Sequence, residues 1–479
     1  ALRPWSRKVL RVELADLPAV EQLDLLNTRQ LSCRELLAAC QERAETTEPV
    51  VNAIPISDWE AAGIVAQRLD DDPSALSGAP LRGLVTAHKD LLETADFRTT
   101  YGSPVFAEFT PGEDHPLVAA LRQAGLVAVG KTNTPEFGAG SHTYNPLHGP
   151  TRNPWDPSRS AGGSSGGAAA ALACGALSVA DGSDLGGSLR NPASFCGVVG
   201  FRPTAGTVPY QVEHDDRIRM PTSGPMGRTV DDVILLHSVM APTITEAPPV
   251  PQTPRLAVSA DLGDLPLDPA VRTVVERAVV KLEAAGWAVE ADLPNLDHAD
   301  LCFEDLRALG FASRFDFRPA DPRVKNVVRA EVAAGRSLDE ARILTAVAIE
   351  TRLQTTWDDF FAAYDLFACA TSQVPPFPLG QPWVDQIDGV PMDRYTDWMR
   401  SCSRLSVPAG PSISIPAGFT EDGLPVGMQL CTARHHDQAL LGLARLAEQV
   451  LCVDRRPPLE RIAGLDPADL PAGPPPEDR

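Results

Sequence analysis

The segment from Arg159 to Thr204 constrains this chain more than any other part of it. It holds two glycine-flanked serines, Ser164 in G-G-S-S-G-G and, 24 positions later, Ser188 in D-L-G-G-S-L-R. Because glycine lacks a Cβ, the backbone beside both serines can approach a substrate closely and present bare N–H groups to it. An alanine-rich run that suits a tightly packed helix follows Ser165. The pattern therefore favours a folded site over a flexible linker.

A lysine completes a candidate catalytic set. The apolar stretch L-V-T-A-H, residues 84–88, is typical of a short buried strand and leads to Lys89. Two serines and one lysine are enough for a nucleophile, a proton relay and a base. His88 also invites a Ser–His pairing, but neighbours on a strand point to opposite faces. If Lys89 faces the site, we expect His88 to face away from it.

Helical and strand-like segments alternate along the chain, which predicts an α/β fold with parallel strands joined by crossover helices. The capping-box spacing of Ser32 and Glu35 supports helix in the first of these segments. Helices are expected over 17–45, 58–70, 116–124, 166–175 and 269–285, and strands over 84–88, 126–129, 177–180, 287–289, 412–415 and 425–430. The aromatic-rich region 298–400 is expected to lay helices and loops over the sheet and to form one wall of a substrate cleft.

Charge and composition exclude several classes of partner. The 479 residues carry a net charge of −21, which argues against nucleic acid and against an anionic membrane surface. There is no run of about 18 apolar residues, and the first residues contain no apolar core of a signal peptide. Nine scattered cysteines without a C-x-x-C are typical of reduced thiols in a cytoplasmic protein.

Other catalytic and binding motifs fail on inspection. Residues 125–132 match the P-loop pattern G-x-x-x-x-G-K-[ST], but the four residues between the glycines are apolar and are themselves the expected strand. No glycine-rich loop remains there to hold phosphate. The sequence contains neither the H-E-x-x-H of metal hydrolases nor the G-x-S-x-G of α/β-hydrolases.

Taken together, four segments resemble the amidase signature enzymes. They are L-R-G-L-V-T-A-H-K-D (81–90), A-G-L-V-A-V-G-K-T-N-T-P-E-F-G (124–138), the 159–204 block and P-S-I-S-I-P-A-G-F-T-E-D-G-L-P-V-G-M-Q-L (411–430). The departures are small: Thr86 stands where the family often has proline, and Leu185 where threonine or methionine is commoner. The resemblance implies a large mixed, mostly parallel twisted sheet flanked by helices on both faces.

The resemblance also assigns roles by matching position. Ser188 would be the nucleophile, Ser164 the serine after a cis peptide bond and Lys89 the base. The backbone N–H groups of Leu185, Gly186, Gly187 and Ser188 would bind the oxyanion. Ser165, Asp184 and Arg190 would support them from behind, and no cofactor or metal is implied.

For this chemistry Lys89 has to be uncharged, so its pKa must fall from about 10.4 to near 7. Burial can do this, because desolvation disfavours the ammonium. Asp90 and Asp184 are close to the site in sequence and would oppose the change if they paired with Lys89. We therefore expect both carboxylates to face other partners.

A single amidase signature domain is expected over 1–463, with its catalytic core at about 75–240 and 405–455, the covering region at about 298–400 and a disordered tail over 464–479. The expected activity is hydrolysis of linear amides, aryl amides or carbamates, as in bacterial general and aryl amidases. Two alternatives stay open: a glutamine-hydrolysing amidotransferase subunit that works with a partner, and a non-catalytic amidase-like binding protein. The sequence leaves homodimerisation open.

Overall fold

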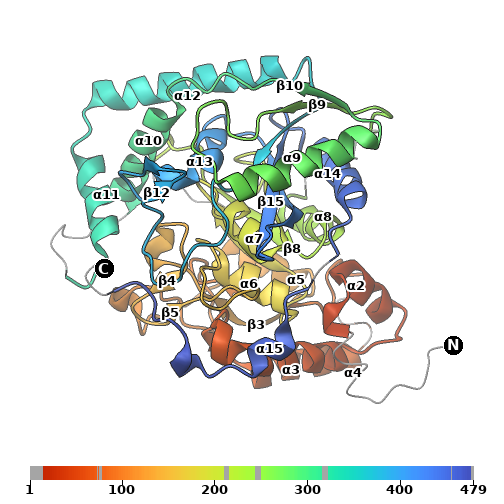
Figure 1. Cartoon of the computed structure of the whole chain (residues 1–479). Helices are drawn as coiled ribbons and strands as arrows, with labels where there is room; N and C mark the ends of the chain where they lie inside the picture. The colour runs from red at the N-terminus through yellow and green to blue at the C-terminus, as the bar shows by residue number, and fades with distance from the viewer. Residues whose placement is uncertain are drawn as a thin grey trace.

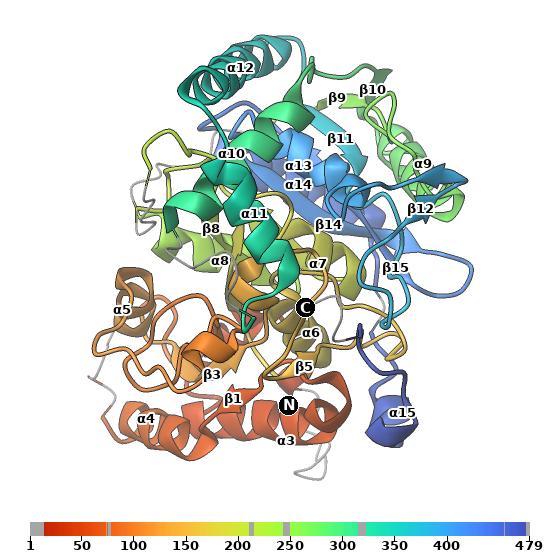
Figure 2. The same cartoon turned by 90° about the vertical axis from the view of Figure 1, so that its left-hand side faces the viewer.

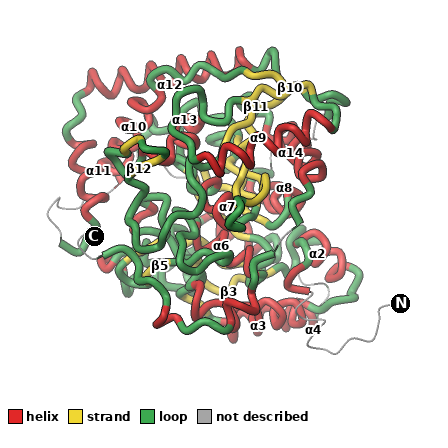
Figure 3. Tube along the Cα trace, in the orientation of Figure 1, coloured by secondary structure: helices red, strands yellow, loops and turns green. Residues whose placement is uncertain are grey.

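The structure of the protein is a computed structural model that describes residues 14–72, 74, 78–209, 215–242, 250–314, 322–454 and 456–475. Figures 1 and 2 show its arrangement from two sides, and Figure 3 shows how helix, strand and loop are distributed along the chain. None of the helices in these ranges combines the length and apolar content that crossing a bilayer requires.

An eight-stranded mixed sheet forms the centre, in the order β10-β9-β11-β15-β14-β7-β8-β6. Only β10–β9 and β9–β11 pair in parallel, whereas the remaining neighbours are antiparallel. The mixed α/β architecture is thus confirmed, but the expectation of mostly parallel strands is wrong, because β7–β8 and β14–β15 connect as neighbours without a crossover. The strands are β6 (Ala180–Asp184), β7 (Val199–Arg202), β8 (Thr222–Gly227), β9 (Arg255–Val258), β10 (Ala288–Ala291), β11 (Leu366–Ala370), β14 (Ser412–Phe419) and β15 (Pro425–Cys431).

A second sheet carries the lysine. Its order is β1-β3-β2, with β2 (Val85–Lys89) parallel to β3 (Val127–Thr132) and β1 (Ile56–Ser57) antiparallel to β3. Strand β2 lies against β6, where Asp181 Oδ1 accepts a hydrogen bond of 2.9 Å from the Lys89 backbone. This contact brings the end of β2 to the serine-bearing segment. Two short hairpins complete the strands: β4 (Tyr144–Asn145) with β5 (Gly149–Pro150), and β12 (Gln386–Ile387) with β13 (Val390–Pro391).

Helices cover both faces of the large sheet, as alternation along β14 shows. Ile413 and Ile415 pack with the apolar residues of α9 and α14, whereas Ser414 faces the side of α7. The helices are α2 (Ala19–Asn27), α3 (Cys33–Val51), α4 (Trp59–Asp71), α5 (Pro116–Gln123), α6 (Gly166–Cys174), α7 (Arg190–Cys196), α8 (Val230–Met240), α9 (Pro269–Ala284), α10 (Ala299–Arg314), α11 (Asn326–Arg336), α12 (Glu340–Phe360), α13 (Arg400–Ser406), α14 (Asp437–Leu451) and α15 (Leu459–Ala463), with 3₁₀ turns η1 (Pro104–Phe106), η2 (Glu136–Gly138), η3 (Asp397–Met399) and η4 (Pro467–Asp469).

One helix and one strand have bounds that differ from those expected from the sequence. The helix expected over 17–45 is divided into α2 and α3, because Ser32 caps α3 in a capping box with Glu35. The strand expected over 177–180 instead begins at Ala180 and contains D-G-S-D. Its polar side chains are stable there because buried partners meet them: Asp181 bonds His88 at 2.6 Å, and Asp184 bonds Arg190. The strand at 126–129 is confirmed by β3, which leaves no phosphate loop between Gly125 and Gly130.

The chain end differs from the expected tail over residues 464–475. Leu465 and Leu470 pack against the core beside α15, and Pro474 is buried. These three apolar side chains fix the proline-rich segment to the rest of the protein. Residues 476–479 of the expected tail lie outside the described residues.

Candidate active site

Lys89 ends β2 as a fully buried side chain whose amine is surrounded by serines. Its Nζ lies 2.8 Å from Ser164 Oγ, 2.8 Å from Ser165 Oγ and 3.0 Å from Ser183 Oγ. The peptide bond between Gly163 and Ser164 is cis. Three of the residues expected at the site, Lys89, Ser164 and Ser165, are therefore brought into direct contact.

Burial lowers the pKa of Lys89 from 10.5 to about 7; the charges of Asp184 and Asp181 oppose this change, and that of Arg314 adds to it. Among the described residues, no carboxylate lies within ion-pair distance of Lys89. Asp90 instead accepts from the Thr100 backbone at 3.0 Å and lies 3.7 Å from Lys131 Nζ. The expectation that Asp90 and Asp184 face other partners is confirmed. The amine can thus lose its proton near neutral pH, as a base must.

Ser183 is a site residue that the sequence reasoning missed. A neutral amine has two N–H donors and one lone pair, and the hydroxyls of Ser165 and Ser183 can take the two donors. The lone pair is then directed at Ser164. A sequence signal existed: Asp181 and Ser183 are two positions apart, so a strand places them on one face, the face that meets β2.

Ser188 precedes α7 and lines a cavity of about 140 Å³ together with Ser164, Leu185 and Gly186. No described residue forms a hydrogen bond with Ser188 Oγ. The structure therefore makes the first contact of the expected relay, Lys89 to Ser164, and leaves the hydroxyl of Ser188 available to the cavity. Catalytic hydrogen bonds are often made only once substrate closes the site.

The backbone N–H groups beside Ser188 differ from the expectation at one position. Gly187 N–H donates to Asp184 Oδ1 at 2.8 Å, and Gly187 does not line the cavity. Leu185, Gly186 and Ser188 do line it. Three of the four residues expected to donate therefore line the cavity, whereas the Gly187 N–H is bound by Asp184. Gly186 also has no room for a side chain, since a Cβ there would lie 2.5 Å from the Phe303 ring.

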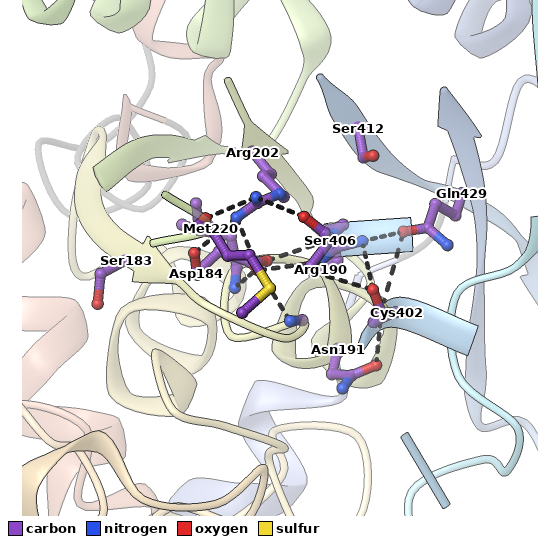
Figure 4. Close-up of polar contacts among 12 residues, drawn as sticks. Ser183, Asp184, Arg190, Asn191, Arg202, Met220, Cys402, Ser406, Ser412 and Gln429 are labelled. Carbon is purple, nitrogen blue, oxygen red and sulfur yellow. Dashed lines mark hydrogen bonds and ion pairs between the residues drawn. The ribbon is translucent and has the colours of Figure 1, made fainter. Parts of the chain in front are cut away.

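Figure 4 shows the buried ion pair that holds this loop. Arg190 donates two hydrogen bonds to Asp184, from Nε to Oδ2 at 3.0 Å and from Nη2 to Oδ1 at 2.9 Å. Burial raises the pKa of Asp184, but the Arg190 charge and hydrogen bonds outweigh burial and hold that pKa well below its usual range. Ser183, the preceding residue, points away from this network (Figure 4). Asp184 thus links Arg190 to the loop, because it also accepts from the Gly187 N–H.

Replacing Arg190 by Met is expected to lower the free energy of unfolding by about 3–5 kcal/mol, because Asp184 keeps its buried charge but loses its bidentate partner. The measurement is urea denaturation at pH 7. Arg217→Met is the matched control: Arg217 pairs with Asp215 while 37% exposed, and an exposed pair contributes at most about 1 kcal/mol. A loss at Arg190 no larger than at Arg217 would contradict the role given to the ion pair.

The cavity wall comes partly from the region expected to supply it. Phe303, Phe311 and Tyr395 line the cavity, as do Ile218, Pro221 and Thr222. Phe137 lines it too and was missed, since it lies in the 124–138 motif and not in the aromatic-rich region. Other aromatics of 298–400 serve the core, among them Trp357 and Trp398. Phe315 and Phe317 lie outside the described residues.

Residues that would serve alternative mechanisms are paired elsewhere or lie outside the cavity. His88 Nδ1 lies 2.6 Å from Asp181 Oδ2, and His88 does not line the cavity. Arg217, Arg219 and Arg228 follow the 159–204 block and are the arginines that the amidotransferase alternative offers as a cation for the glutamine head group, but none of them lines the cavity. Arg217 pairs with Asp215, and Arg219 pairs with Glu350. Within the described part of the chain, no group of three or more His, Cys, Asp or Glu side chains is placed to hold a metal ion.

The chain matches the family description Amidase over residues 35–441. It belongs to the amidase family. This amidase is 32% identical to the A subunit of the glutamyl-tRNA(Gln) amidotransferase of Moorella thermoacetica, over 93% of this chain and 99% of that protein. It is also 32% identical to an acylamidase from Rhodococcus erythropolis, over 89% of this chain and 93% of that protein.

The amidase also resembles a solved structure of 6-aminohexanoate cyclic dimer hydrolase complexed with substrate, with 26% identity and a TM-score of 0.82. That likeness covers 93% of this chain and 99% of the other. Family membership and the α/β fold expected from the sequence are confirmed, and so is an enzyme that hydrolyses amide bonds.

Proposed function

We propose that this amidase hydrolyses linear aryl amides through an acyl-enzyme on Ser188, with Ser164 as proton relay and Lys89 as base. The observation that carries the proposal is the 2.8 Å contact between Ser164 Oγ and a buried Lys89 Nζ whose pKa is lowered to about 7. That contact lies beside an apolar cavity lined by Ser188 and by aromatic rings. The aromatic wall favours an aryl group over a short polar chain.

In the proposed first half-reaction, Ser188 Oγ attacks the carbonyl carbon while its proton passes to Ser164 Oγ and the Ser164 proton passes to Lys89 Nζ. The carbonyl oxygen becomes an oxyanion that accepts from the N–H groups of Leu185, Gly186 and Ser188. Collapse breaks the C–N bond, and the proton returns through Ser164 to the leaving nitrogen. Water then attacks the ester at Ser188, releasing the carboxylic acid and restoring the serine.

A panel of acetanilide, an aliphatic amide, an aryl carbamate and glutamine tests the substrate class. We expect the largest kcat/KM for acetanilide, followed by the carbamate, because both place a ring against Phe303 and Phe311. Ser188→Ala supplies the background rate for every member. A panel in which the aliphatic amide is hydrolysed fastest would contradict the aryl preference.

Glutamine hydrolysis for a partner protein is the second candidate, favoured by the likeness to the amidotransferase of Moorella thermoacetica. Such a site needs a cation and an anion for the amino-acid head group. Arg307 and Arg314 line the cavity, but Arg307 pairs with Glu331, and Asp184, the one carboxylate among the described lining residues, is bound by Arg190. Glutaminase activity that appears only with a second protein would favour this reading over the first.

A further inference from the structure

The catalytic cavity shares a wall with a larger cavity beside it. The inner cavity, which holds Ser188, has a volume of about 140 Å³, and the outer one has about 420 Å³. Phe303, Arg307 and Tyr395 line both. The two spaces therefore meet at these three residues. Helices α10 and α11, which lie side by side in Figures 1 and 2, supply most of the outer lining.

The buried guanidinium of Arg307 holds together the wall formed by Phe303, Arg307 and Tyr395. Arg307 is 6% exposed, and its guanidinium stacks 4.7 Å from the centre of the Phe311 ring and 5.2 Å from that of Tyr395. The same guanidinium pairs with Glu331 of α11, whose Oε1 also accepts from the Tyr395 hydroxyl at 3.2 Å. Arg307, Glu331 and Tyr395 thus brace one another across three segments of the chain.

The inner cavity is small for an amide substrate. A cavity of about 150 Å³ holds one benzene ring. A second ring that extends toward Phe303 and Tyr395 would meet the wall between this cavity and the outer one. Four of the described residues that line the outer cavity are carboxylates, and three of them pair with arginines: Glu304 with Arg394, Asp305 with Arg342 at 2.8 Å and Glu331 with Arg307. Because most of these charges are paired and Asp393 adds a negative one, the outer space suits an uncharged group better than an anion.

We propose that Arg307 and Tyr395 determine specificity by limiting this amidase to substrates with one ring beside the scissile bond, and that the outer cavity is a second subsite for uncharged two-ring amides, which opens when the wall is removed. This proposal rests on the proposed function, since it names the size class of substrate at the same site. The Tyr395 ring is the part of the wall that a substitution can remove without leaving an unpaired buried charge, because Arg307 keeps Glu331.

The test measures wild type and Tyr395→Ala with two pairs of substrates. In the first pair, one-ring and two-ring anilines are joined to the same acid. In the second pair, one-ring and two-ring acids are joined to the same aniline. We expect the two-ring to one-ring ratio of kcat/KM to rise about 10-fold or more in Tyr395→Ala for at least one pair, which is the size of effect that a change of pocket shape gives. Tyr395→Phe keeps the ring and should change the ratio less than about 3-fold. Tyr364→Ala is the matched control, because Tyr364 bonds Glu290 and Asp292 and lines neither cavity.

A one-ring and a two-ring aryl sulfonyl fluoride give a readout that needs no amide turnover, as they label an activated serine directly. If wild type labels at Ser188 but hydrolyses no anilide, the proposed substrate class fails while the labelling ratio still tests the wall. Ratios that stay within about 3-fold of wild type in a folded Tyr395→Ala enzyme, checked by its thermal unfolding, would overturn the inference.

Discussion

Ser188→Ala is expected to lower kcat/KM for an anilide by on the order of 10³–10⁶-fold, because the acyl-enzyme cannot form without the hydroxyl. The rest of the site stays in place: Lys89 keeps its contacts with Ser164 and Ser165, and Leu185 and Gly186 keep their place in the cavity. A residual rate above that in water would come from these groups. Steady-state kinetics and mass spectrometry of the trapped acyl-enzyme measure the two consequences.

Ser238→Ala serves as the control for Ser188→Ala. Ser238 is exposed on α8, and among the described residues its hydroxyl bonds the Leu235 carbonyl alone. We expect turnover close to wild type there and acylation of the same peptide that contains Ser188. Undiminished turnover by Ser188→Ala, or acylation at another serine, would show that the nucleophile has been assigned wrongly.

Lys89→Met is expected to lower kcat/KM by about 10³-fold or more, since it removes the base and the amine that contacts Ser164. In wild type the rate should rise with pH through about 7, because Lys89 is protonated and inactive as a base below its lowered pKa. The variant should lose this limb. A rate profile from pH 5 to 9 for both enzymes, with Lys281→Met as control, measures the difference. A variant that keeps the limb near pH 7 would assign it to another group.

Lys89 should also lower the free energy of unfolding at neutral pH. Lowering its pKa from 10.5 to about 7 corresponds to about 5 kcal/mol at 1.36 kcal/mol per pKa unit. Between these values the unfolded chain binds the extra proton, so stability rises with pH there, and the cost is fully present below pH 7. We expect the difference in unfolding free energy between Lys89→Met and wild type to favour the variant at pH 7 and to shrink toward pH 10. A difference independent of pH would mean that Lys89 is not buried as a neutral amine.

Helix ends could be predicted from the sequence, whereas strand directions could not. The capping box at Ser32 and the proline-led helix α9 depend on residues a few positions apart, and both form as expected. Strand direction depends instead on which segments meet in space. Alternating helices and strands predict a mostly parallel sheet, whereas β14 pairs antiparallel with both β7 and β15.

The side chains proposed to do the chemistry are identifiable from the amino-acid sequence. Glycine spacing and strand burial are properties of the local backbone, and they point to Lys89, Ser164 and Ser188. The tuning of those groups emerges only in the folded molecule. There Ser183 contacts Lys89, Asp184 binds the Gly187 N–H, and Arg190 donates to Gln429 across 239 positions of the chain. The reason is physical: a pKa and a hydrogen-bond partner depend on what surrounds a group, and segments far away in the chain supply those surroundings.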